Sequence, residues 1–136
     1  MPAHVTATGI PDFFLIGLHA QPGSKVTASE LNALVEVYDS TTEVFQTSNG
    51  VMMGDFNADC TYLSKAKYDE LDLVTDDKFT WLLDSDEDTT TGNTHCAYDR
   101  LVECSLNAYM LVTHTYSVAT VSHMHTVIHK HTLTHT

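Results

Sequence analysis

The chain has 136 residues, enough for one small domain, and its hydrophobic fraction of 43% is ordinary for a globular protein. No apolar run approaches the ~20 residues that a membrane-spanning helix needs. The formal net charge of −12 argues against a structural DNA-binding module, because such modules bind phosphates through Lys and Arg. An enzyme that meets DNA through divalent cations is compatible with this charge, since bound cations reverse the local electrostatics.

The first part of the chain predicts one strand followed by one helix. Residues 1–12 show no regular pattern and are expected to be irregular. The apolar run Phe13 to Leu18 predicts a buried strand, and without a basic region before it this run is a poor signal peptide. The sequence TASE at residues 27–30 matches a helix capping box. Helical spacing follows at Leu31, Leu34, Val35, Tyr38 and Phe45.

The middle of the chain continues with short elements. Asn49-Gly50 predicts a turn, and Val51 to Met53 predicts a strand that ends at Gly54. Strand, helix and strand in this order are typical of a layered α/β fold. Further along, we expect a short helix over 64–73, a strand over 79–83, an acidic loop over 84–92 and a strand over 98–102.

The composition changes near residue 107. Residues 107–136 hold six of the nine histidines, many threonines and no Asp or Glu. Alternating Thr and His is what a translated CA repeat would give, so we expect a poorly ordered tail after a domain over residues 1–106. The alternative is a His-rich metal-binding protein, although the histidines lack regular ligand spacing.

The chain has three cysteines, Cys60, Cys96 and Cys104, and none forms a Cys-x-x-Cys pair. A zinc knuckle or a thioredoxin-like site is therefore disfavoured. One disulfide with a spare thiol and three reduced cysteines both fit this count.

Three segments carry residues that can do chemistry. In GDFNADC (residues 54–60), Asp55 can hold a divalent metal or polarise water, and Asn57 can orient a phosphate; for this pair alone an ordinary Asx turn is favoured. In THCAYDR (residues 94–100), Asp99 lies beside Arg100, and the alternative is a surface ion pair of little energetic value. His19 directly follows an apolar strand, where a lone histidine is more often structural.

Taken together, GDFNADC, EDTTTGNTHCAYDR (residues 87–100) and LHAQP (residues 18–22) closely resemble deoxyribonuclease I and its secreted relatives in the endonuclease/exonuclease/phosphatase superfamily. The resemblance runs from about Phe13 to Val102. It implies an α/β fold, part of a four-layer sandwich with two sheets. The implied activity is metal-dependent endonucleolytic hydrolysis of DNA phosphodiester bonds with Mg²⁺ and Ca²⁺. It also implies secretion, and the compartment of this chain stays open; neither a membrane nor an obligate protein partner is indicated.

The resemblance implies a role for each matching position. His19 corresponds to a catalytic histidine, Asp55 to an active-site acid that also binds metal, and Asn57 to the active-site amide. Asp99 corresponds to an acid that normally hydrogen-bonds a second histidine. Cys60 and Cys96 correspond to a disulfide pair.

The resemblance also implies a structural calcium loop, at Asp88, Thr90 and Thr94, in which Gly92 replaces a usual side-chain ligand. Two other family features do not match. No part of the given sequence matches the family's N-terminal half with its metal-binding glutamate, and the Ser-Asp-His motif has no counterpart in it, because Ser122-His123 lacks the aspartate. We therefore expect a C-terminal-half fragment lacking both ends, with impaired activity. The alternative is a non-catalytic fragment or pseudoenzyme.

Overall fold

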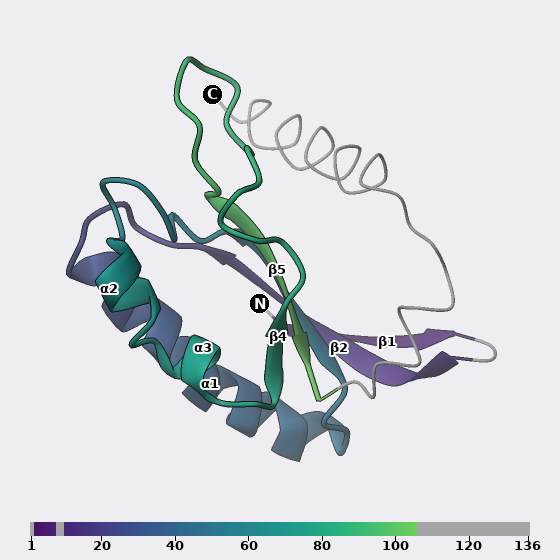
Figure 1. The fold of residues 1–136 in the computed structure, drawn as a ribbon. Coiled ribbons are helices and arrows are strands. Elements are labelled where there is room, and N and C mark those ends of the chain that lie inside the picture. The colour runs from purple at the N-terminus through teal and green to yellow at the C-terminus, as the bar shows by residue number, and fades with distance from the viewer. Residues whose placement is uncertain (1, 8–9, 106–136) are drawn as a thin grey trace, which may run out of the picture. The chain divides into compact units, whose positions relative to one another are not determined.

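The computed structural model describes residues 2–7 and 10–105, which form five strands and three helices (Figure 1). In chain order these elements are β1 (Pro2–Ala7), β2 (Ile10–His19), α1 (Val26–Phe45), β3 (Gly50–Asp55), α2 (Lys65–Tyr68), α3 (Asp72–Thr75), β4 (Phe79–Trp81) and β5 (Asp99–Cys104). The expected strand–helix–strand unit is confirmed as β2, α1 and β3.

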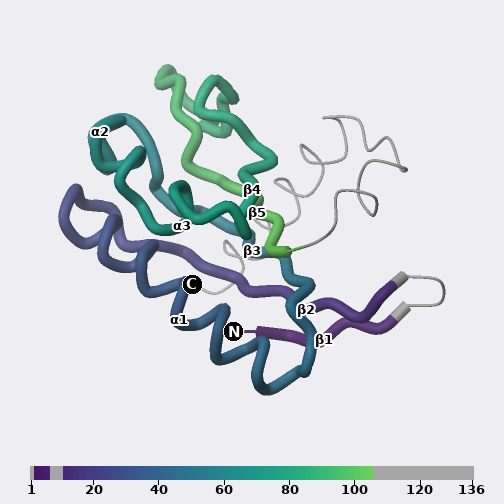
Figure 2. Tube along the Cα trace, turned by 60° about the horizontal axis from the view of Figure 1, so that its bottom comes forward, coloured from purple at the N-terminus to yellow at the C-terminus, as the bar shows by residue number. Residues whose placement is uncertain are grey.

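The strands form one mixed sheet in the order β1-β2-β3-β5-β4. The two strands joined by α1, β2 and β3, are parallel, and all other neighbours are antiparallel. The helices lie together on one face of this sheet (Figures 1 and 2). The α/β class is confirmed, and these two layers are consistent with part of a four-layer sandwich.

The core fills the space between α1 and the helix-covered face of the sheet. From α1, Leu31, Leu34 and Tyr38 are buried, and this spacing of three and four residues is what an amphipathic helix needs. From β2, Phe14 and Ile16 face them, because alternate residues of a strand point to the same side. The apolar residues that the periodicity of the sequence marked in α1 and β2 are therefore buried in the structure.

Residues 1–12 are not irregular as expected. Pro2–Ala7 form β1, which pairs antiparallel with β2, and β2 itself begins at Ile10 rather than Phe13. A two-stranded hairpin places this segment at the edge of the sheet, so its backbone hydrogen bonds do not require a strongly apolar sequence. The pattern of apolar and polar residues therefore gives little indication of an edge strand such as β1.

The expected capping box is also wrong. The helix begins at Val26 and has Lys25 as its N-cap residue, without a side-chain cap. Thr27 is the second residue of the helix, and its hydroxyl donates to the Gln21 carbonyl and accepts from the Gly23 amide. The Glu30 carboxylate accepts from the Gln21 amide. These side chains therefore tie the preceding loop to the helix instead of capping it.

The remaining expectations differ mainly in their boundaries. The single helix expected over 64–73 is two short helices, α2 and α3, because Leu71 between them is extended. The acidic segment 84–92 is a loop as expected, and β5 begins and ends slightly later than predicted. Residues 106–136 lie outside the described residues, so the predicted tail and domain division stay predictions. Within the described part, no helix is long and apolar enough to cross a membrane.

Candidate active site

Three of the sequence-predicted catalytic residues form one row across the sheet. His19 at the end of β2 pairs in register with Asp55 at the end of β3, and Asp55 pairs with Asp99 at the start of β5. Strand alternation puts this row on the face opposite the helices, since Phe14 and Ile16 in β2 face the core. Residues 80 positions apart in the sequence thus meet on three adjacent strands.

Close approach of β2 and β3 supports this row. Gly54 has φ of 135°, and a Cβ there would lie 2.0 Å from the Leu18 carbonyl oxygen. A side chain is therefore excluded immediately before Asp55. The backbone link continues past the strands, because the Ala20 amide donates to the Asp55 carbonyl at 2.8 Å.

The two carboxylate oxygens of Asp55 have different partners. Oδ2 lies 3.6 Å from His19 Nε2, and the two side chains are 35% and 69% exposed, respectively. Oδ1 accepts from the Asn57 backbone amide at 3.0 Å. This second contact is the Asx turn that the sequence suggested as the alternative. The turn uses one oxygen and leaves the other beside the histidine, so the two interpretations of this motif are compatible.

Asn57 is held more tightly than the motif suggested. Its φ is 49° and its side chain is buried, with 5% of the residue exposed. Nδ2 donates to the Ala20 carbonyl at 2.7 Å, directly after the end of β2. In this arrangement, the amide nitrogen joins the loop after β3 to the end of β2 and is committed to that contact.

Thr89, which the sequence motifs did not single out, positions Asp99. Its hydroxyl accepts from the Tyr98 and Asp99 amides at 2.9 and 3.0 Å and donates to the Cys96 carbonyl at 3.3 Å. These contacts fix the chain as it enters β5. A threonine inside a TTT run gives no local signal for this role.

Arg100 is not part of a surface ion pair, contrary to the simple alternative for the YDR segment. It is 2% exposed, and its guanidinium donates to the Leu83 carbonyl at 2.9 Å and to the Ala58 carbonyl at 3.2 Å. The group also lies 5.6 Å from the Tyr68 ring centre and 5.4 Å from that of Trp81. Burial lowers the pKa of Arg100. The side chain therefore links the loops after β3 and β4.

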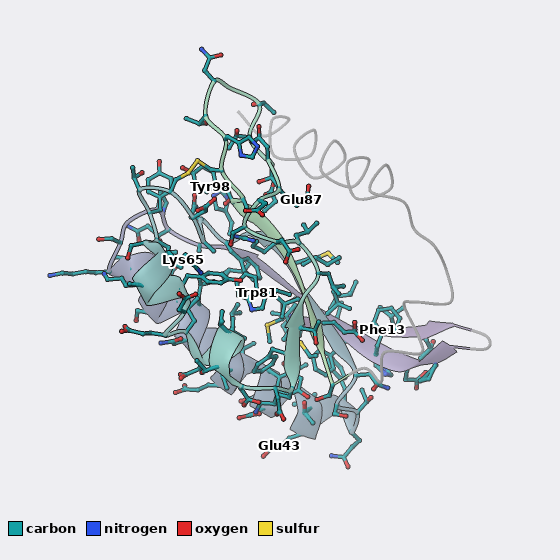
Figure 3. All side chains as sticks on the ribbon, viewed as in Figure 1. Phe13, Glu43, Lys65, Trp81, Glu87 and Tyr98 are labelled. Carbon is teal, nitrogen blue, oxygen red and sulfur yellow. A yellow bond between two sulfur atoms is a disulfide. The ribbon has the colours of Figure 1, made fainter. Side chains whose placement is uncertain are left out.

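A disulfide joins Cys60 and Cys96, as the family resemblance implied, and Cys104 is a buried free thiol. The Tyr62 and Tyr98 rings, each two residues after a bridged cysteine, pack against each other with centroids 5.2 Å apart; Tyr98 is labelled in Figure 3. The sequence did not predict the contact between Tyr62 and Tyr98, because the two tyrosines are 36 positions apart. This contact joins the loop after β3 to the residue directly before Asp99.

The predicted calcium loop brings three oxygens together. The Asp88 Oδ1 atom accepts from the Thr90 amide at 3.0 Å and from its hydroxyl at 2.6 Å, and that hydroxyl also contacts the Thr94 carbonyl. The Thr90 hydrogen bonds lower the pKa of Asp88. Ca²⁺ prefers six to eight oxygen ligands, so this exposed all-oxygen set fits calcium as a partial site that water would complete.

The residues around Asp55 fit Mg²⁺ less fully. Among the described residues, the single cluster of three His, Cys or acidic ligand atoms is Asp59, Cys60 and Cys96, whose sulfurs are joined in the disulfide. No such cluster surrounds Asp55 in this part of the chain. Mg²⁺ is commonly held by one or two carboxylates with water and substrate phosphate. Asp55 therefore fits as a single protein ligand.

The ends of three adjacent strands thus carry an exposed histidine and two in-register acids. Comparison with known proteins shows which proteins this part of the chain is similar to. The chain is 42% identical over 102 residues to mouse (Mus musculus) deoxyribonuclease gamma, covering 74% of this chain and 32% of that protein. It is 42% identical over 94 residues to human (Homo sapiens) deoxyribonuclease-1-like 1, covering 68% of this chain and 30% of the relative.

Human deoxyribonuclease-1 is 40% identical over 95 residues, which is 70% of this chain and 33% of the relative. The chain thus spans about a third of the length of the curated relatives that it matches. No family model matches the chain. Over the matched residues, the chain is similar to a segment of deoxyribonuclease-I-like proteins, as its motifs predicted.

Proposed function

We propose that the chain is a metal-dependent DNA phosphodiesterase of reduced activity, with His19, Asp55, Asn57 and Asp99 as its site residues and Mg²⁺ and Ca²⁺ as its cofactors. The observation that carries the proposal is the His19–Asp55–Asp99 row, at the positions that the deoxyribonuclease motifs mark. The names of the relatives supply DNA as the substrate class.

The chemistry follows from the exposure of the row. The His19 ring is exposed and has the Asp55 carboxylate at one nitrogen, so it can exchange a proton with an attacking water or a leaving oxygen. Asp55 orients this ring and presents an oxygen that would hold Mg²⁺. When bound, a divalent ion supplies positive charge that stabilises negative charge on the phosphate oxygens. Asn57 fixes the loop behind Asp55, and Asp99 completes the row.

The calcium loop would act at a distance from the phosphate. Asp88, Thr90 and Thr94 would hold Ca²⁺, which would order the segment that runs into Cys96 and Asp99. The Thr90 hydroxyl bridges the Asp88 carboxylate and the Thr94 carbonyl. The loop is therefore partly organised for the cation.

Reduced activity is expected because the described row contains one histidine. A single histidine leaves one of two proton transfers without a positioned catalyst, commonly a loss of about 10²–10⁴-fold. The acidic composition adds little attraction for DNA. A non-catalytic role is the second candidate, and the observation in its favour is that the Asn57 amide nitrogen is buried against Ala20.

Nicking of supercoiled plasmid in Mg²⁺ and Ca²⁺ tests the proposal. We expect the purified chain to nick far more slowly than a complete family member, and Asp55→Asn and His19→Gln to remove most of that activity. His95→Gln is the matched control, because His95 is also exposed but lies outside the row. Nicking that persists unchanged in both row variants would show that the row does not carry the activity, and no nicking at all would support the non-catalytic alternative.

A further inference from the structure

The loop after β3 has two adjacent attachments to the segment that leads into β5. One is the Cys60–Cys96 disulfide. The other is Asp59, whose Oδ2 accepts from the Ala97 backbone amide at 2.8 Å while Oδ1 accepts from the Cys60 amide at 2.7 Å. The second attachment is unrelated to the catalytic chemistry of the row and has no counterpart in the motif roles given above.

The two attachments close nearly the same loop of chain. The disulfide joins residues 36 positions apart, and the Asp59–Ala97 hydrogen bond joins residues 38 positions apart. Once either contact has formed, the entropy cost of bringing the two segments together has been met for the other. Each attachment must therefore favour the other, by the reciprocity that applies to any pair of coupled equilibria.

We propose that Asp59 is a positioning residue that works in parallel with the Cys60–Cys96 disulfide and keeps the loop after β3 in place when that disulfide is reduced. Any effect of this attachment on DNA cleavage, through the position of Asn57 two residues before Asp59, rests on the proposed function. The attachment itself does not depend on it. Arg100, which donates to the Ala58 carbonyl, is a further restraint on the same loop.

The negative charge of Asp59 should also stabilise the disulfide against reduction, as the shared loop closure does. A carboxylate oxygen of Asp59 and both sulfur atoms lie within 4.8 Å of one another. Reduction by a dithiol reagent breaks the S–S bond with two electrons and two protons, and the reagent becomes a disulfide. A nearby carboxylate disfavours ionisation of the resulting thiols. Asp59 should therefore make the disulfide harder to reduce by both routes.

The experiment equilibrates the full chain with mixtures of reduced and oxidised dithiothreitol, traps thiols by alkylation and measures the reduced fraction by mass spectrometry. We expect Asp59→Ala to shift the equilibrium toward reduction about tenfold, which corresponds to about 30 mV. Asp59→Asn keeps an acceptor oxygen but removes the charge, so its shift should be smaller. The matched control is Asp76→Asn, because Asp76 Oδ1 also accepts a backbone amide, from Lys78, away from the disulfide.

A second measurement follows the reduced state itself. Hydrogen exchange of the Ala97 amide should stay slow in reduced wild-type chain and become fast in reduced Asp59→Ala, while amides of β3 change little. An unchanged thiol–disulfide equilibrium in Asp59→Ala, or an equal shift in Asp76→Asn, would overturn the proposal. Both readouts are independent of nicking, so loss of the proposed nuclease function would leave this result standing, and the converse also holds.

Discussion

Glu103 gives the sharpest test of the energetics of this fold. It lies on β5, is 6% exposed, and its Oε1 atom has no hydrogen-bond partner within the described part of the chain. Burial raises the pKa of this carboxyl. The folded chain therefore holds the proton more tightly than the unfolded chain does. Its contribution to stability is fully present below the unfolded pKa, about 4.3, and is lost as the pH rises through the folded pKa.

We predict that Glu103→Gln stabilises the chain at pH 7, because it removes a buried charge and keeps the shape of the side chain. A buried polar atom without a hydrogen-bond partner costs roughly 1–3 kcal/mol, and the glutamine NH₂ group needs a partner of its own. A net gain of about 1 kcal/mol is therefore expected, which raises Tm by roughly 4–8 °C for a domain of this size.

The assay is thermal unfolding followed by circular dichroism at pH 7 and at about pH 4, near the unfolded pKa of a glutamate. The gain should shrink at the lower pH, where the wild-type carboxyl becomes protonated. Glu70→Gln is the control, since Glu70 is exposed between α2 and α3. A lower Tm for Glu103→Gln at pH 7, or a gain of equal size at both pH values, would refute the reasoning.

Three further predictions follow from single contacts. Gly54→Ala should cost about 3 kcal/mol or more in urea unfolding, because its Cβ would meet the Leu18 carbonyl, whereas Gly17→Ala, with nothing within 4 Å of the added Cβ, should cost much less. Cys104 is fully buried and burial raises its pKa to about 12, so a thiol reagent should leave the native chain unmodified and label one thiol after denaturation; rapid native labelling would contradict this. Asp88→Ala should weaken Ca²⁺ binding at least tenfold by calorimetry, and an unchanged affinity would exclude the proposed calcium loop.

The family resemblance predicted the disulfide pairing and the site residues, which the residue pattern alone left open. The cysteine count allowed one bridge or none, and the match to a family pair selected Cys60 with Cys96, which the structure confirms. The same match selected His19, Asp55, Asn57 and Asp99 as site residues. The functional roles of these residues stay predictions. Arg100, by contrast, was interpreted from its neighbour alone, and that interpretation missed its burial.

The sequence by itself determined the elements whose apolar residues repeat with a clear period. The runs around Phe14 and Met52 and the α1 positions Leu31 and Leu34 mark β2, β3 and α1, because burial on one face imposes that period. Only the tertiary structure decided the sheet order, the edge strand β1 and the contacts of Thr27. It also decided that His19, Asp55 and Asp99 share one row. Strand pairing and register depend on contacts between residues far apart in the chain, and no local pattern encodes them.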